Sequence, residues 1–144
     1  MIEICNPSQC TGCWACFNVC SKGAISMREG KLGHLHPSID TKKCVDCGLC
    51  VKICPSMQQQ ELLNPQIAYA GWAKDKIEYT SSTSGGIASI VSRYIIRNGG
   101  VVYGCACLEN LDIRHIRVTD EKDLYKLKGS KYVQSNILRS TNLS

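Results

Sequence analysis

The sequence predicts an α+β protein in two parts, and three observations lead to this fold class. Eight of the eleven cysteines lie in two equally spaced runs near the N-terminus. From residue 66 onward cysteine becomes sparse, and strand-like segments flank one amphipathic helical segment. A chain of 144 residues has room for one domain or two small ones. We therefore expect a cysteine-rich module over residues 1–58, a linker over 59–66 and a partial α/β domain over 67–144.

The two cysteine runs share the spacing C-x-x-C-x-x-C-x-x-x-C and are offset by 34 residues, from Cys10 to Cys44, so the module is an internal repeat. In two-cluster bacterial ferredoxins, runs of this kind hold two 4Fe-4S clusters, and the fourth cysteine of each run ligates the other cluster. The spacing thus predicts a two-cluster bacterial ferredoxin-like module with crossed ligands. The expected ligands are Cys10, Cys13, Cys16 and Cys54 for one cluster and Cys44, Cys47, Cys50 and Cys20 for the other.

Two other uses of so many cysteines fit less well. Zinc ribbons use pairs of C-x-x-C separated by a longer loop, so the third and fourth cysteines of each run are surplus to such a tetrahedral site. A disulfide framework requires an oxidising compartment, but residues 1–4 lack the basic region and apolar stretch of a signal peptide. We expect reduced thiols and a cytoplasmic location.

Composition and charge argue against two further classes of function. The chain is 44% hydrophobic and 20% charged, as soluble globular proteins are, and no apolar stretch approaches the roughly 20 residues that cross a bilayer. The formal charge of +5 counts cysteines as neutral, and two clusters that each add roughly −2 leave the holoprotein near +1. Because no basic stripe with interleaved aromatics remains, we do not expect nucleic-acid binding. Because the apolar stretches are too short, we do not expect a membrane span.

Between the cysteine runs, two short strands are expected over residues 24–27 and 35–39, with Gly30 and Gly33 in the turn that joins them. A module this small buries little core without its metal, so we expect cluster assembly and folding to be one event.

The second part is expected to begin with a strand over residues 67–73, followed by a polar segment over 80–86. A helix comes next, because apolar residues recur at helical spacing, and residues 98–100 (Asn-Gly-Gly) end it. The apolar stripe of this helix is Ile87, Ile90, Val91, Tyr94 and Ile95.

Two more strands are expected after the helix, a buried one over residues 101–106 and another over 113–118, joined by a turn at 110–112. Thr119 is expected to cap a last helix with acidic residues in its first turn, and Gly129 to end it.

Serines and glycines before the first long helix form a second candidate site. They would offer unpaired backbone N–H groups at a helix N-terminus and let a phosphate approach closely. A segment after Gly129 could add a cation and an aromatic ring. A capped loop and a surface lysine would explain the same residues, so both interpretations stay open at this point. The candidate residues are Ser84, Gly85, Gly86, Ser130, Lys131 and Tyr132.

The cysteine module is followed by five short segments: residues 69–72 (YAGW), 82–86 (STSGG), 99–104 (GGVVYG), 115–117 (HIR) and 129–135 (GSKYVQS). In this order the chain resembles the beta subunit of coenzyme F-420 hydrogenase and its dehydrogenase relatives. The resemblance implies a flavin domain in which FAD exchanges single electrons with the clusters and a hydride with a deazaflavin or related acceptor. It also implies that residues 84–86 contact the flavin phosphates, with residues 130–132 beside them.

Two features depart from that family. Ser21 follows the first run where the ferredoxin pattern usually has proline, and the family continues into a larger C-terminal lobe, so we expect this chain to be truncated and to bind FAD weakly. The expected function is that of an iron-sulfur electron-transfer subunit or fragment of a flavin-dependent oxidoreductase. Its partner would be a hydrogenase, a dehydrogenase or a ferredoxin. The alternatives are a plain ferredoxin-like carrier whose second segment only docks a partner, and a structural metal module.

The remaining cysteines and histidines are assigned ordinary roles, and no residue is assigned to catalysis. Cys5, Cys105 and Cys107 are expected to pack as small buried residues. His34, His36 and His115 are expected to be surface or packed side chains.

Overall fold

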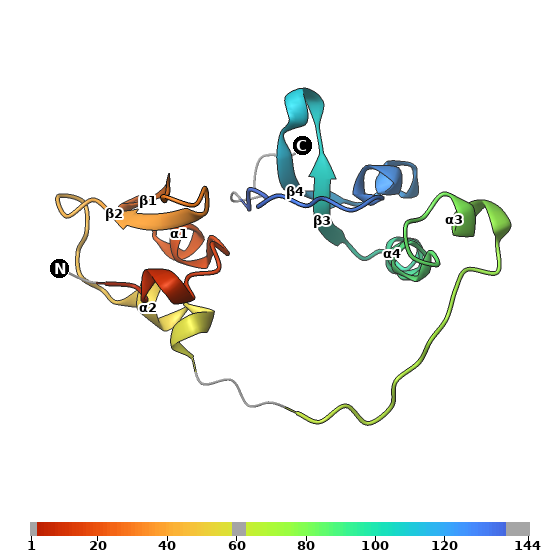
Figure 1. Ribbon diagram of the computed structural model, residues 1–144, viewed down its shortest axis with the longest axis horizontal. Coiled ribbons are helices and arrows are strands. Elements are labelled where there is room, and N and C mark those ends of the chain that lie inside the picture. The colour runs from red at the N-terminus through yellow and green to blue at the C-terminus, as the bar shows by residue number, and fades with distance from the viewer. Residues whose placement is uncertain (1–2, 59–62, 138–144) are drawn as a thin grey trace. The chain divides into compact units, whose positions relative to one another are not determined.

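The computed structural model describes residues 3–58 and 63–137. These residues form two compact units, one built mainly from residues up to 63 and one from residues 64–136 (Figure 1). Each unit contains helices and, within its described residues, one two-stranded antiparallel sheet. The mixed α+β class is therefore confirmed. Half of the linker expected over 59–66 falls on residues 59–62, which lie outside the described residues.

The first unit contains helices α1 (Ala15–Val19) and α2 (Leu49–Lys52) and strands β1 (Ile25–Glu29) and β2 (Leu35–Ile39). Short 3-10 turns at Pro7–Gln9 and Pro55–Met57 flank the two cysteine runs. The strands pair from Ile25 opposite Ile39 to Glu29 opposite Leu35, and Gly33 in their turn has a φ of +81°. The two expected strands are confirmed, the first one starting one residue later and ending two residues later than predicted.

The internal repeat is visible in the backbone of the cysteine loops. Gly12 and Asp46, 34 residues apart, have φ values of 63° and 59°, and Trp14 and Gly48, the N-caps of α1 and α2, have values of 64° and 71°. The left-handed region costs energy for residues other than glycine, so the surrounding structure must hold Trp14 and Asp46 there. Trp14 is buried and packs edge-on against Phe17, with 5.1 Å between ring centroids.

The core of the first unit consists largely of cysteine. Its five buried members are Ile4, Cys16, Ile25, Cys50 and Cys54. Three of the five are expected cluster ligands, so little purely hydrocarbon core remains to stabilise this unit.

The second unit contains helices α3 (Lys76–Thr80) and α4 (Ile87–Arg97) and strands β3 (Val102–Cys107) and β4 (Ile113–Val118), and it ends with a 3-10 helix η4 (Glu121–Leu127). The predicted helix end is confirmed by Gly99, with a φ of +76°. The turn predicted at 110–112 is also confirmed. The core is small and contains Ala106, Ile116, Val118 and Leu124.

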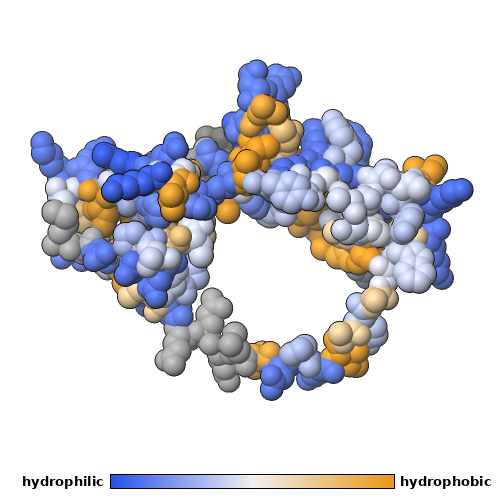
Figure 2. All heavy atoms as spheres, viewed as in Figure 1, coloured by the Kyte–Doolittle hydropathy of each residue, from blue (hydrophilic) through white to orange (hydrophobic). Residues whose placement is uncertain are grey.

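The strand predicted over residues 67–73 is wrong, since this segment has no regular secondary structure. Apart from Ala73, which is buried, its apolar side chains are exposed, Tyr69 to 88%, and the segment lies at the surface in Figure 2. A strand needs a neighbour whose N–H and C=O groups pair with its own. Within the described residues, the only pairing of this kind on the segment is one bond from the Ala73 N–H to the Gly85 carbonyl at 2.6 Å.

Two details of the last elements also differ from the prediction. The final helix is a 3-10 helix capped by Asp120, not by Thr119, because the Asp120 carboxylate accepts a hydrogen bond from the Lys122 N–H. Its predicted end is confirmed by Gly129, which follows the C-cap with a φ of +81°.

Strand β3 is not buried as predicted, because only one face of it meets the core. Ala106 points inward, so Cys105 and Cys107, its neighbours on either side, point to the opposite face. Cys105 is half-buried and Cys107 is exposed, which contradicts the expected burial of Cys107.

Helix α4 turns its polar side toward its own unit. The predicted apolar stripe is exposed, with Tyr94 69% and Val91 50% accessible. Residues on the opposite side are half-buried, and Ile96 packs against the core. None of the described helices has the length and apolar composition needed to cross a membrane.

Candidate functional site

Four cysteines from both runs line one cavity of the first unit: Cys10, Cys13, Cys16 and Cys54. The first three belong to the first loop and to α1. Cys54 belongs to the second run and is the N-cap of the turn Pro55–Met57.

A second cavity is lined by Cys20, Cys44, Cys47 and Cys50. Here the residue from the other run is Cys20, the C-cap of α1. The structure thus brings together the same two sets of four that the spacing predicts.

The short helices explain why each run contributes to both cavities. Cys16 lies within α1 and Cys20 is its C-cap, and Cys50 lies within α2 with Cys54 one residue beyond the C-cap Ile53. Four helical residues rise by about 6 Å, so the last cysteine of a run is carried one turn beyond the third. Because α1 and α2 lie against each other, that turn leads to the neighbouring cavity.

The residues present fit a cluster with several metal atoms. Within the described residues, no three His, Cys, Asp or Glu side chains converge as the ligands of a single ion would. Instead, four thiols are spread around each cavity, and a 4Fe-4S cluster takes four such thiolates. The loop backbones, with left-handed residues on both sides of Cys13 and Cys47, belong to the type whose N–H groups form concavities at iron-sulfur sites.

Burial favours the protonated form of several of these thiols. It raises the pKa of Cys16 to about 11 and also raises that of Cys50, although backbone N–H groups oppose the shift. These two thiols therefore carry their protons at neutral pH until a metal displaces them. Because metal ligation requires the thiolate, cluster assembly releases protons here.

The cysteines differ in their access to solvent. Cys16, Cys50 and Cys54 are buried, whereas Cys47 is exposed. Val45 and Leu49, which also line the second cavity, have exposed side chains as well. The second cavity is thus the one with an exposed cysteine in its wall.

Cys5 is a fifth cysteine in the wall of the first cavity. It is half-buried and packs against the core, as expected for a small apolar side chain. Burial and the neighbouring Cys54 and Cys10 raise its pKa to about 12, so it is a thiol at neutral pH. No spacing or motif in the sequence indicates that it lies beside the predicted ligands.

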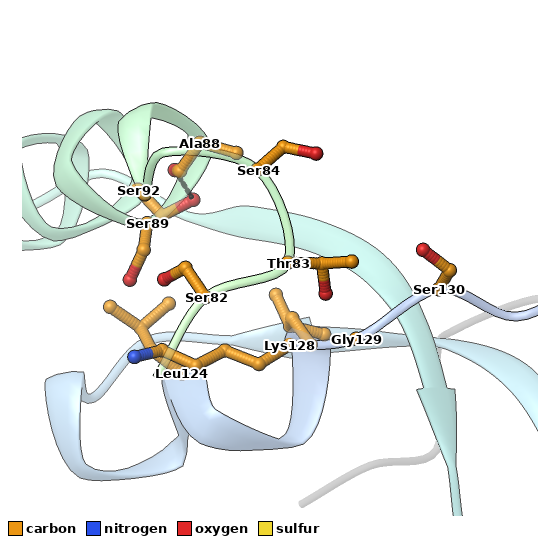
Figure 3. A pocket seen from close by; sticks show the side chains of 12 residues that line it. Ser82, Thr83, Ser84, Ala88, Ser89, Ser92, Leu124, Lys128, Gly129 and Ser130 are labelled. Atoms are coloured by element: carbon orange, nitrogen blue, oxygen red, sulfur yellow. Dashed lines mark hydrogen bonds between the residues drawn. The ribbon is translucent and has the colours of Figure 1, made fainter. Parts of the chain in front are cut away.

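A separate pocket lies at the N-terminus of α4 in the second unit (Figure 3). Gly86, with a φ of +79°, is the N-cap of this helix, and a Cβ there would lie 3.1 Å from that of Ala73. The hydroxyl-bearing residues that line the pocket are Ser82, Thr83, Ser84, Ser89, Ser92 and Ser130.

Only some of the predicted phosphate-site residues line this pocket. Ser84, Gly86 and Ser130 do, whereas Gly85, Lys131 and Tyr132 are not among its lining residues. The Lys131 ammonium donates instead to the carbonyls of Lys128, at 2.7 Å, and Gly129, at 3.1 Å, and Tyr132 is 92% exposed.

The pocket residues that sequence reasoning missed include Ser89, Ser92 and Lys128. Ser89 and Ser92 lie three residues apart on the side of α4 away from its apolar stripe, so helical spacing could have identified them. Lys128 has no local sequence signal. It comes from the segment that follows η4 and lies at the pocket only because that segment folds back toward α4.

Glu78 fixes Lys128 at the pocket. Its buried carboxylate accepts hydrogen bonds from the Lys128 ammonium and from the Arg93 guanidinium, both at 2.7 Å, and from the Ser82 hydroxyl at 3.1 Å. The pKa of Glu78 is lowered to about 2, mainly by the hydrogen bond from Lys128. The hydroxyls of Ser89 and Ser82 and the Arg93 guanidinium lower it further. This carboxylate therefore stays ionised at all physiological pH values.

We predict that this carboxylate makes the second unit acid-sensitive. The pKa of Glu78 is lowered on folding from 4.5 to about 2, so its contribution is complete above about pH 4.5 and is lost as the pH falls toward 2. The loss should be on the order of 2 kcal/mol. Protection of the α3 and α4 amides against hydrogen exchange, compared between wild type and Glu78→Gln, measures it. Equal pH dependence in both proteins would contradict this role.

Comparison with known proteins agrees with the cysteine geometry. Residues 9–57 match the 4Fe-4S dicluster domain family. Over 94% of its length, the chain is 24% identical to a subunit of the F(420)H(2) dehydrogenase of Methanosarcina mazei. Over 32% of its length, it is 44% identical to a subunit of the ion-translocating oxidoreductase complex of Methanosarcina acetivorans. The chain spans only 42% and 16% of these relatives. The family match over residues 9–57 thus agrees with the two sets of four cysteines and supports an iron-sulfur electron-transfer role.

Proposed function

We propose that this chain relays single electrons through two 4Fe-4S clusters to or from FAD, as part of a flavin-dependent oxidoreductase. The observation that carries the proposal is the pair of cavities, each lined by three cysteines of one run and one of the other. In this proposal Cys10, Cys13, Cys16 and Cys54 hold the first cluster, and Cys44, Cys47, Cys50 and Cys20 hold the second.

The crossed arrangement favours transfer between the clusters. Cys16 and Cys20 of one short helix belong to different cavities, so the two sites are joined through a single helical turn. When bound, the clusters supply one-electron chemistry, and FAD supplies the conversion between single electrons and a hydride. The chain's own cysteines hold the two clusters close together.

The pocket at α4 is the proposed place for part of the flavin. The eleven-residue helix α4 directs its free N–H groups and its positive dipole end there, and Lys128 adds a cation held in place by Glu78. Of the residues proposed to contact the flavin phosphates, Ser84, Gly86 and Ser130 line this pocket and Lys128 joins them, whereas Gly85, Lys131 and Tyr132 are not among its lining residues. Residues 1–58 would then form the cluster module and residues 67–144 the beginning of the flavin domain.

The names of the two relatives guide the choice of partners. One relative belongs to an F(420)H(2) dehydrogenase and the other to an ion-translocating oxidoreductase complex. We therefore propose a redox partner subunit for this chain and a deazaflavin as the hydride donor or acceptor. A plain ferredoxin-like carrier is the competing function, and it predicts no flavin binding.

The first test is metal analysis. Anaerobically reconstituted protein should contain about eight iron and eight sulfide per chain, because two cubanes each contain four of both. Elemental and sulfide analysis on protein of known concentration measures this. About four iron per chain, or zinc in place of iron, would be incompatible with two clusters.

The second test addresses the crossed ligands. Cys20→Ser should alter the cluster held by Cys44, Cys47 and Cys50, because Cys20 lines their cavity, and Cys54→Ser should alter the other one. Paramagnetic resonance of the reduced variants measures this. Cys13→Ser and Cys47→Ser are the matched controls that assign each signal. If Cys20→Ser behaved like Cys13→Ser, each run would bind its own cluster.

The third test concerns the flavin. This chain should bind FAD weakly, and Lys128→Gln should weaken binding about tenfold by removing a charge-assisted contact to phosphate. Lys131→Gln is the matched control, because the Lys131 ammonium donates to backbone carbonyls and does not line the pocket. Fluorescence titration with FAD measures both. A larger effect of Lys131→Gln would place the phosphates beyond the pocket, and no binding at all would favour the plain carrier.

A further inference from the structure

The internal repeat relates the two cysteine cavities, and one of the positions at which their walls differ carries a thiol in the first cavity only. Cys5 lines the first cavity, and the position 34 residues later, Ile39, lines the second. Both side chains pack against the same core of the first unit. The repeat therefore places a thiol beside one set of ligands and a hydrocarbon side chain beside the other.

Cys5 is well placed to act on the ligands of the first cavity. Its side chain lines the same cavity as Cys10 and Cys54 and packs against the core that contains Cys54. Four other cysteines already surround this cavity, one for each iron of a cubane, so Cys5 is surplus to the ligand set. A surplus thiol beside ligand thiolates can donate its S–H proton to them, whereas Ile39 has no proton to donate.

We propose that Cys5 is a positioning residue that donates a hydrogen bond to a ligand sulfur of the first cluster and makes this cluster easier to reduce than the second. The inference rests on the proposed function, since it requires that both clusters are present. Reduction adds one negative charge to a cluster and its thiolates. A hydrogen bond strengthens as its acceptor becomes more negative, so the S–H group stabilises the reduced form.

The chain offers reciprocal variants for the test. Cys5→Ile gives the first cavity the side chain of the second, Ile39→Cys gives the second cavity a thiol, and Cys5→Ser keeps a donor at position 5. The measurement is a redox titration of the full anaerobically reconstituted chain, followed by paramagnetic resonance. Signals are assigned with Cys13→Ser and Cys47→Ser, and iron is determined in every sample.

Cys5→Ile should lower the potential of the first cluster only, so that its ratio of reduced to oxidised form at a fixed potential falls about tenfold, or 59 mV for one electron. Ile39→Cys should raise the potential of the second cluster, and Cys5→Ser should stay close to wild type. If Cys5→Ile does not assemble its clusters, the potential of the second cluster in Ile39→Cys decides between the outcomes.

Three results would overturn the inference. Unchanged potentials in Cys5→Ile and Ile39→Cys would make Cys5 a packing residue only. Loss of iron from the first cluster in Cys5→Ser would make it a ligand. Equal shifts of both clusters would indicate a general change in the fold. Wild-type protein without iron would instead refute the proposed function itself, and the iron determination separates that outcome from the others.

Discussion

The first unit has almost no hydrocarbon core, and the rest of its structure follows from that constraint. Cysteines supply three of its five buried core residues, and its helices span four and five residues. Helices this short are not stable alone, because too few hydrogen bonds offset the entropy of ordering them. What the cysteines bind must therefore contribute much of the folding free energy, as in other small metal-dependent modules.

Sequence reasoning succeeded where the structure depends on local spacing. The distance between the third and fourth cysteine of each run fixes one helical turn, so the two sets of four follow from the pattern. Sequence reasoning failed where the local structure depends on contacts with residues distant in the sequence. Residues 67–73 have the pattern of a strand, but no strand among the described residues pairs with them, and Lys128 enters the pocket through a fold-back that no motif signals. Thr119 and Asp120 are adjacent residues that can each cap a helix, and in the structure Asp120 is the N-cap.

The second unit uses its longest helix in an unusual orientation. The serines of α4 face inward and its apolar stripe faces outward, so the inner side of the helix contributes hydroxyls to a pocket instead of hydrocarbon to a core. Glu78, held by Arg93 of α4 and by Lys128, supplies part of the cohesion that a hydrocarbon core would otherwise give. Stability and the chemistry of the pocket thus depend on the same ion pairs in this unit.

The exposure of Cys47 affects how a cluster in the second cavity would react with oxygen. Dissolved oxygen and peroxide would reach a cluster in the second cavity through this side chain before they reached the buried ligands. Destruction of that cluster would free Cys20, and with it the end of α1, whose Cys16 lines the other cavity. Damage at one exposed sulfur would then spread through a single helical turn, so oxygen should inactivate the two clusters as a pair.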